Sequence, residues 1–417
     1  MTSVPVAHSG EPLAAHRRIL LADADAFFVA VARQADPEGA GRARLLIVGG
    51  SAERRGVVTS ASYEARAYGV RSAMPMARAL KLCPDATVVP VPMGLCRSRS
   101  RDIRRVLEQM APVVSAASVD EWYLDLDGTE ALYHHEPLSR TAHRIRDAVI
   151  AATGLTVSIG GGTNRLVAKL AVERAKPKPG SGADGVHIVP PGGEASFMAG
   201  LHLRDLPGVG PRLQERLERA GLLTVAETLT RDIPALERIT GNERTARWLH
   251  ARIRGVDESP VTPGRVARSI SRDETFARDV HEDAELEREL WRLVTRAASD
   301  LRAAGLRART VTVRLRDSDF SNRQASRTLP EWVETERAIA PVALELLARL
   351  RRARRVPARL LGVALSSLGG GEEAQLGLFT DEPSAAVETA RDRALTRAVD
   401  AVHARFGRDR LVPGRLA

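Results

Sequence analysis

The chain has 417 residues, of which 62 are Lys or Arg and 52 are Asp or Glu, so its formal net charge is +10. This length predicts about three domains, and the positive excess favours a polyanionic partner, with nucleic acid first. Cys83 and Cys96 are too few for a disulfide framework or a zinc cluster. No apolar signal segment opens the chain, and charges interrupt every longer apolar run. We therefore expect a cytoplasmic protein that does not enter a membrane.

The first acidic motif follows residues 1–17, which we expect to form a disordered leader. Ile19 to Phe28 is an apolar run interrupted by Asp23 and Asp25. It predicts a strand over residues 19–24 and then a helical stretch through Ala32. In a strand, residues two apart lie on one face, so both carboxylates would point the same way.

A second acidic run, Ser118 to Asp125, places Asp120 beside Glu121. Successive strand residues point to opposite faces, so this pair can serve one site only at a hairpin tip or bend. Solvated carboxylates on a surface strand are the alternative. Charges in two half-buried strands favour a bound cation instead. Oxygen ligands suit Mg²⁺, and two such ions would support phosphoryl or nucleotidyl transfer.

A third stretch, Gly49 to Pro75, is rich in Arg, hydroxyl groups and Gly. Arg66 follows Tyr63 by three residues, which places both on one side of a helix. Such groups hold phosphate oxygens through charge-assisted hydrogen bonds. A solvated helix with ordinary surface arginines has the same composition, so composition alone leaves both interpretations open.

These segments, together with residues 79–84, resemble successive motifs of the Y-family translesion DNA polymerases, in the DinB or polymerase IV branch. The resemblance covers nearly the whole chain. It implies that Asp23, Asp120 and Glu121 are catalytic carboxylates that bind two Mg²⁺ ions, with Mn²⁺ as an alternative. It also implies that the carbonyl of Ala24 contacts the second ion. Asp25 belongs to the motif but is not assigned as a ligand.

The resemblance also implies a set of contacts to the incoming nucleotide. They are Phe27, Phe28, Ser60, Tyr63, Arg66 and Lys176. Phe28 matches the steric gate, a ring that leaves no room for a ribose 2′-hydroxyl; a core aromatic is the alternative role. Lys176 belongs to a Lys-Pro pair that ends a predicted helix. Lys169 on the same helix is expected to snorkel or form a salt bridge, outside the site.

Two residues depart from the family's usual pattern. Trp122 replaces a small residue after the Asp-Glu pair, and Cys96 stands where an aromatic is common. Neither change removes a ligand.

Leu206 to Pro211 predicts a turn between helices in which Gly208 and Gly210 let the backbone approach a phosphate. It resembles a helix-hairpin-helix, which clamps the DNA backbone; a simple helix–helix turn is the alternative. Farther on, residues 310–316 alternate strictly, so Arg314 and Arg316 should project from a sheet. Helices are expected around residues 286–301 and 342–352, and a strand at 360–365. In the family this unit is the DNA-gripping little finger, while a solvated face is the alternative.

The last motif lies in a glycine-rich, polar setting and consists of Gln375, Leu376, Gly377, Leu378 and Phe379. It resembles the pentapeptide by which bacterial polymerases dock onto the sliding clamp, with Gln375, Leu376, Leu378 and Phe379 as contacts. Apolar anchors in such a setting suit a partner's groove. Folding back onto the little finger, or a linker to the helical run at 386–406, are the alternatives.

The expected fold is α+β, a multidomain right-hand polymerase that acts as a monomer. The expected parts are a palm (18–34 and 90–184), fingers (35–89), a helix-hairpin-helix thumb (185–258), a linker (259–268), a little finger (269–370) and a tail (371–417). Its partners would be primer-template DNA, deoxynucleoside triphosphates and the sliding clamp. The expected activity is low-fidelity, template-directed translesion synthesis without proofreading. The alternatives are a catalytically inactive scaffold that binds the clamp, a UmuC-type translesion subunit, and a nucleotide cyclase.

Overall fold

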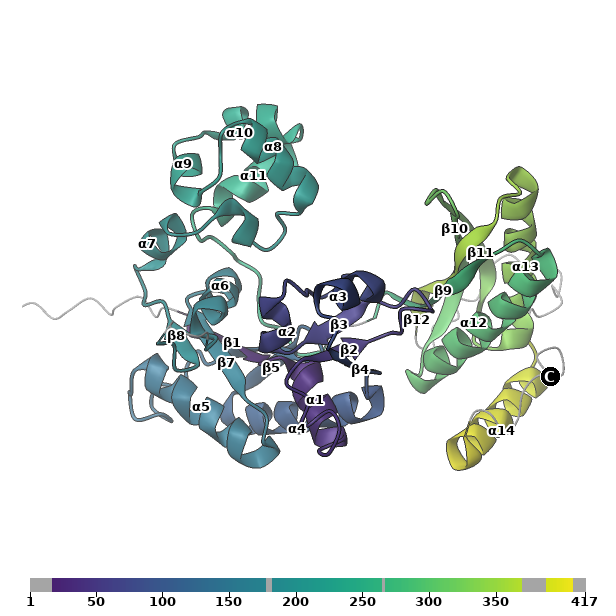
Figure 1. Ribbon diagram of the computed structural model, residues 1–417, viewed down its shortest axis with the longest axis horizontal. Coiled ribbons are helices and arrows are strands. Elements are labelled where there is room, and N and C mark those ends of the chain that lie inside the picture. Colours follow the sequence, from purple (N-terminus) through teal and green to yellow (C-terminus); the bar gives the residue numbers. More distant parts are fainter. Residues whose placement is uncertain (1–16, 178–181, 265–266, 370–387, 408–417) are drawn as a thin grey trace, which may run out of the picture. The chain divides into compact units, whose positions relative to one another are not determined.

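The computed structural model describes residues 17–177, 182–264, 267–369 and 388–407 (Figure 1). The chain forms two compact units. The first comprises residues 1–49, 58–74 and 78–265, and the second residues 50–57, 75–77 and 266–417. The expected leader lies outside the described residues except for Arg17. No helix in the described part of the chain is long and apolar enough to cross a membrane.

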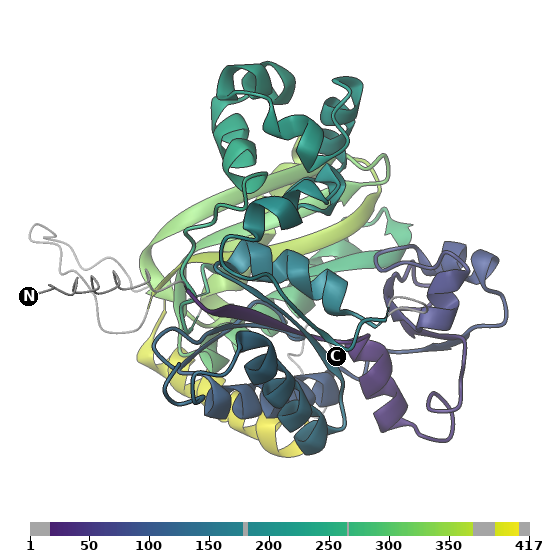
Figure 2. The ribbon, with the colours of Figure 1, turned by 90° about the vertical axis from the view of Figure 1, so that its left-hand side faces the viewer.

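The first unit is built on a five-stranded sheet with the order β5-β6-β1-β7-β8. The strands are β1 (Ile19–Ala24), β5 (Val113–Ala116), β6 (Glu121–Asp125), β7 (Val157–Gly162) and β8 (Val186–Ile188). In Figure 2 the purple strand β1 runs through the unit and leads into α1 (Phe27–Ala35). The strand and helix expected over residues 19–32 are therefore confirmed.

The two faces of this sheet are covered by different helices. Leu20 and Ala22 of β1 join Trp122 in a core with α4 (Met93–Met110) and α5 (Leu138–Thr153). Ile19 and Leu21 face the other way, toward α6 (Arg165–Ala175). The period of two then places Asp23 on the α6 face.

Helix α6 packs unusually close to β7 because of one glycine. A Cβ on Gly160 would lie 2.1 Å from the backbone nitrogen of Val172. Any side chain there would push α6 away from the sheet. Gly160 thus helps to fix the helix that faces the acidic residues of β1 and β6.

The first unit also contains a small sheet with the order β3-β2-β4. Its strands are β2 (Leu46–Gly49), β3 (Val58–Ala61) and β4 (Thr87–Val89), and its helices are α2 (Tyr63–Ala67) and α3 (Met76–Leu82). Ser62 caps α2 by accepting a hydrogen bond from the backbone N–H of Ala65. The cap begins the helix at Tyr63 and therefore puts Tyr63 and Arg66 on one helical side.

Residues 194–252 form a helical cluster. It contains α7 (Glu194–Ala199), the 3₁₀ turn η1 (Leu203–Asp205), α8 (Pro211–Arg219), α9 (Val225–Leu229), α10 (Ile233–Thr240) and α11 (Glu243–Arg252). Its apolar core includes Leu217 and Leu249 and continues to Leu166 of α6. The turn before α8 needs a glycine, because Gly208 has φ +100° and its Cβ would lie 2.6 Å from the Trp248 ring.

The second unit contains a four-stranded antiparallel sheet with the order β11-β10-β12-β9. The strands are β9 (Ser269–Val280), β10 (Arg307–Asp317), β11 (Asn322–Val333) and β12 (Ala358–Gly369). Helices α12 (Asp283–Ala303) and α13 (Glu336–Ala353) share one apolar core with the sheet. Val311, Val313 and Leu315 are buried in that core, which confirms their predicted inward direction.

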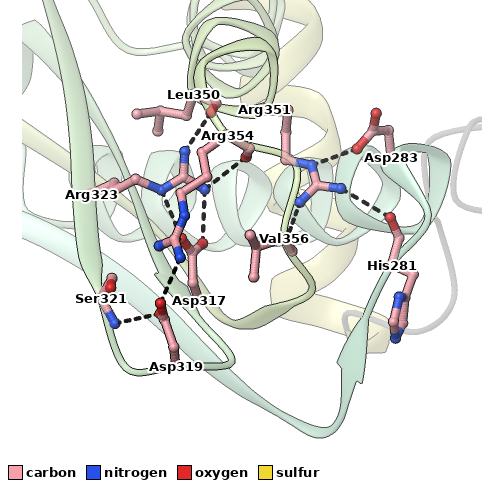
Figure 3. A network of polar contacts seen from close by, with 10 residues as sticks. All are labelled: His281, Asp283, Asp317, Asp319, Ser321, Arg323, Leu350, Arg351, Arg354 and Val356. Carbon is pink, nitrogen blue, oxygen red and sulfur yellow. Dashed lines mark hydrogen bonds and ion pairs between the residues drawn. The ribbon is translucent and has the colours of Figure 1, made fainter.

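A buried carboxylate ties the β10–β11 hairpin to the end of α13 (Figure 3). Asp317 is fully buried and accepts hydrogen bonds from Arg323, with N–O distances of 2.9 and 2.8 Å, and from Arg354 at 2.9 Å. Arg323 also donates to the carbonyl of Leu350, in the last turn of α13. The charged groups therefore compensate one another and close the end of the helix.

A final helix, α14 (Ala390–Phe406), confirms the helical run expected at the end of the chain. Ion pairs join it to α12 and α13. Arg302 donates to both carboxylate oxygens of Asp400, at 2.7 and 2.9 Å, and Arg337 pairs with Asp392 at 2.9 Å. The Glu388 carboxylate accepts the backbone N–H of Thr335 at the start of α13.

Candidate active site

Two acidic residues face each other on neighbouring strands. Asp23 in β1 and Glu121 in β6 are direct partners in the antiparallel register. Asp120 lies in the bend between β5 and β6, and its carbonyl accepts the N–H of Ala24 at 2.9 Å. The hairpin bend that Asp120 and Glu121 would need in order to serve one site is therefore present. Beside the bend, Ser118 hydrogen-bonds to the Asp120 carboxylate.

Two lysines of the α6 segment reach this acidic pair. Lys176 Nζ lies 3.1 Å from Asp23 Oδ2 and 2.6 Å from a Glu173 oxygen. Lys169 Nζ contacts Glu121 Oε1 and lies 3.9 Å from Asp23 Oδ2. The salt bridge expected as one alternative for Lys169 is therefore confirmed, although its partners are the acids of the site from which sequence reasoning left this lysine out. Its spacing of seven residues from Lys176, two helical turns, was the signal that could have included it.

Burial dominates the electrostatics of Asp23, whose exposed fraction is 7%. Burial raises its pKa to about 7, attraction to Lys176 opposes the rise, and repulsion from Glu121 adds to it. Burial also works against the charged form of Lys176, but attraction to Asp23 and Glu173 outweighs it and raises that pKa. The site therefore disfavours uncompensated negative charge and attracts cations.

The donor set fits a hard divalent cation. Asp23, Asp120 and Glu121 offer carboxylate oxygens and Ala24 a backbone carbonyl, the ligand types of Mg²⁺. The described residues contain no group of three His, Cys, Asp or Glu side chains already arranged around one point. Ammonium groups contact Asp23 and Glu121 instead, which shows that the pair accommodates positive charge.

Asp25 does not lie in β1, which ends at Ala24. Its carboxylate accepts a 2.7 Å hydrogen bond from Ser158 of β7. Burial raises its pKa, and the hydrogen bond from Ser158 partly offsets that effect. Asp25 thus has a partner of its own within the sheet.

The expected triphosphate contacts Ser60, Tyr63 and Arg66 lie together beside α2. Arg66 donates to the carbonyl of Ala61 at 2.9 Å and to Ser60 Oγ at 3.4 Å, and its guanidinium stacks over the Tyr63 ring at 5.1 Å. Burial raises the Tyr63 pKa, with a further contribution from the charge of Asp25. The Tyr63 hydroxyl is thus close enough for the charges of Asp23 and Asp25 to act on it.

Phe27 and Phe28 begin α1 and have different surroundings. Ala26 before them adopts a left-handed conformation, with φ 45°. Phe27 is buried at 2% exposure in the core between the five-stranded sheet and helices α4 and α5, whereas Phe28 is only partly buried. Their rings meet edge to face, 5.5 Å apart. Phe28 is therefore the ring of the pair that is accessible to a ligand.

The other expected contacts lie farther along the chain. Gly208 and Gly210 form the turn before α8. Arg314 and Arg316 project from β10 and have internal partners, Asp273 at 3.7 Å and Asn322 at 2.8 Å. The clamp motif at residues 375–379 lies outside the described residues.

Comparison with known proteins identifies the family. Residues 22–173 match the impB/mucB/samB family, and residues 267–378 match the C-terminal domain of that family. A DNA polymerase IV of Caulobacter vibrioides is 35% identical over 94% of this chain and 92% of its own length. A DNA polymerase IV of Halorhodospira halophila is 38% identical over 84% of this chain and 95% of its own.

Solved structures agree on the fold. A Y-family DNA polymerase chimera of Dbh and Dpo4 superimposes with a TM-score of 0.75 at 24% identity, covering 85% of this chain and all of the chimera. The expected α+β right-hand fold is thus confirmed, and so is the family resemblance. Y-family DNA polymerases are metal-dependent nucleotidyltransferases. The chain therefore belongs to the Y family of DNA polymerases, of the DNA polymerase IV type, and is a DNA-directed DNA polymerase that carries out translesion synthesis.

Proposed function

We propose that Asp23, Asp120 and Glu121 are the carboxylates at which this polymerase joins a deoxynucleotide to a primer 3′ end. The observation that carries the proposal is the cross-strand pair of Asp23 and Glu121, with two lysine ammonium groups on it. Carboxylates are rarely buried opposite each other unless cations bind between them. The oxygen ligands of these residues and the membership of the family both favour Mg²⁺, with two ions per site.

Two bound Mg²⁺ ions would activate the primer hydroxyl and neutralise the triphosphate. The chain's own part is to hold oxygen ligands in place. Asp23 and Glu121 present carboxylates from rigid strands, Asp120 from the adjoining bend, and Ala24 its carbonyl. Rigid strands suit this task because small displacements of reacting groups cost much of the rate.

Lys176, Tyr63 and Arg66 would bind the triphosphate, with Ser60 supporting Arg66. Arg66 has an orienting hydrogen bond to Ala61, so its guanidinium is already ordered for phosphate oxygens. The ammonium group of Lys176 already lies between the carboxylates of Asp23 and Glu173, and it would turn from Asp23 to the phosphates when a nucleotide binds. Phe28, whose ring meets the buried Phe27 edge to face, would exclude nucleotides that carry a 2′-hydroxyl.

DNA would be held outside the catalytic carboxylates. The turn at Gly208 and Gly210 suits backbone phosphates, and Arg314 and Arg316 project from a sheet with polar neighbours. The motif at residues 375–379 would tether a monomeric polymerase to the sliding clamp, which raises its effective concentration on DNA. We place this activity in the cytoplasm, with low fidelity and no proofreading.

The test is a primer-extension assay with purified full-length protein, Mg²⁺ and one deoxynucleotide at a time. The nucleotide that complements the template base should be added preferentially, and the preferred nucleotide should change when the template base is changed. Addition that ignores the template would contradict template-directed synthesis, whereas no addition to any primer would favour the inactive scaffold. A clamp-binding assay on the same preparation then separates a scaffold from a misfolded protein.

A further inference from the structure

We propose that Lys169 is an internal counterion that occupies the cation position between Asp23 and Glu121 until a divalent metal displaces it. The proposal rests on the proposed role of these two carboxylates as metal ligands. It assigns Lys169 the opposite effect from a ligand: its ammonium group competes with the metal.

The geometry places one ammonium on both carboxylates. Lys169 Nζ contacts Glu121 Oε1 and lies 3.9 Å from Asp23 Oδ2. These two residues are direct cross-strand partners, so the ammonium bridges β1 and β6. In the described part of the chain, the salt bridges of Lys169 are to these two acids.

Lys176 differs from Lys169 in having a second anionic partner outside the pair. Its Nζ lies 2.6 Å from Glu173, one turn earlier on the same segment. Lys176 can therefore leave Asp23 for a phosphate and stay paired with Glu173. Among the described residues, the ion pairs of Lys169 offer no such alternative, so its charge is committed to Asp23 and Glu121.

Charge balance gives the physical reason for competition. Asp23 and Glu121 together carry two negative charges when ionised, and Lys169 and Lys176 supply two positive charges. A metal ion that enters between Asp23 and Glu121 meets both repulsion from the ammonium groups and oxygens that are already occupied. Loss of one ammonium should therefore strengthen metal binding.

Displacement of Lys169 is sterically simple. Its backbone is fixed, because α6 packs tightly on β7 at Gly160. Its side chain is 26% exposed and has four rotatable carbon–carbon bonds, so the ammonium can turn toward solvent. The fixed helix and the mobile side chain together suit a reversible occupant.

Direct metal binding tests the inference without relying on activity. Mn²⁺ is titrated into the full chain, without DNA or nucleotide, and free Mn²⁺ is followed by electron paramagnetic resonance. Lys169→Met keeps the approximate length of the side chain but removes its positive charge. This variant should bind Mn²⁺ about tenfold more tightly than the parent, because the positive charge of Lys169, which lies 3.9 Å from an Asp23 oxygen, no longer repels the ion. Lys169→Arg should bind like the parent, and so should Lys81→Met, which changes an exposed lysine of α3.

Glu121→Gln separates this inference from the proposed function. If Glu121→Gln does not weaken Mn²⁺ binding, the carboxylate assignment itself fails. If Glu121→Gln weakens binding but Lys169→Met binds like the parent or more weakly, the carboxylates stand and the competing role of Lys169 is wrong. Lys169→Gln provides a second neutral variant, and circular dichroism confirms that each variant is folded.

Discussion

Asp23 of β1 lies directly opposite Glu121 of β6, and both side chains point to the sheet face that α6 covers. Like charges directly opposite each other destabilise a sheet. Lys169 and Lys176 compensate the pair, but burial still raises the pKa of Asp23 to about 7. The pair of Asp23 and Glu121 therefore lowers the stability of the folded protein while providing a place for a cation to bind.

The raised pKa of Asp23 predicts a pH-dependent stability. Its ordinary value is 3.8, so between about pH 4 and pH 7 the folded state binds the proton more tightly than the unfolded state. The contribution of Asp23 to the free energy of unfolding is therefore fully present below about pH 4 and is lost as the pH rises through 7. Without divalent metal, Asp23→Asn should be more stable than the parent at pH 8 by up to about 4 kcal/mol.

Urea denaturation of the parent and Asp23→Asn at several pH values measures this difference. The gap should close as the pH falls toward 4, because a protonated Asp23 resembles asparagine. A gap that is independent of pH, or a parent that is the more stable protein at pH 8, would refute the burial argument.

Phe28→Ala should admit ribonucleotides. Removing the ring opens space beneath the sugar, where Phe28 is only partly buried and rests on Phe27. The ratio of kcat/KM for ribonucleotide to that for deoxynucleotide should rise roughly 10- to 200-fold, the usual effect of one group in a pocket. Phe28→Tyr keeps the ring and should keep the discrimination. An unchanged ratio for Phe28→Ala would make Phe28 a packing residue only.

Asp317→Ala should destabilise the second unit. Asp317 is fully buried, so its loss leaves the guanidinium of Arg323 without its main partner (Figure 3). Loss of one member of a buried ion pair typically costs about 3–5 kcal/mol. Hydrogen exchange on the full chain should show faster exchange in β10, β11 and the end of α13. Asp319→Ala, which removes an exposed partner of Arg354, is the control and should have a much smaller effect.

Much of the fold could be predicted because apolar periodicity marks it. Strand 19–24 matches β1, and the helix expected around 286–301 lies within α12. Strands β9 and β11 were not predicted, because each alternates charged and polar residues with few apolar ones; Pro330 further weakens the pattern of β11. Helix α4 was also missed, since arginines dominate its sequence.

The acids of the proposed site follow from the sequence, but the lysines that pair with them do not. Motif resemblance points to Asp23, Asp120 and Glu121, and the hairpin bend follows from strand geometry. The contact between Lys169 and Glu121 joins residues 48 positions apart. Sequence spacing cannot show which of several cations meets a given carboxylate, because the packing of α6 on the sheet decides it.

The clamp motif predicts a separable tether. Replacing Leu378 and Phe379 with Ala should leave basal primer extension unchanged and remove its stimulation by loaded sliding clamp, because these residues are the apolar anchors of the motif. Leu395→Ala is a suitable control, since that leucine is 64% exposed on α14. Stimulation that persists in the double variant would place the clamp contact elsewhere.

The most direct test of the account compares catalysis with DNA affinity in Asp120→Asn and Glu121→Gln. Primer extension with Mg²⁺ should fall at least about 1000-fold, because metal ligands stabilise the transition state by several kcal/mol. Primer-template affinity should stay close to that of the parent, since DNA is held by basic surface elsewhere. Glu108→Gln, an exposed change on α4, should alter neither quantity. Near-normal extension in either site variant would contradict the assignment of the active site.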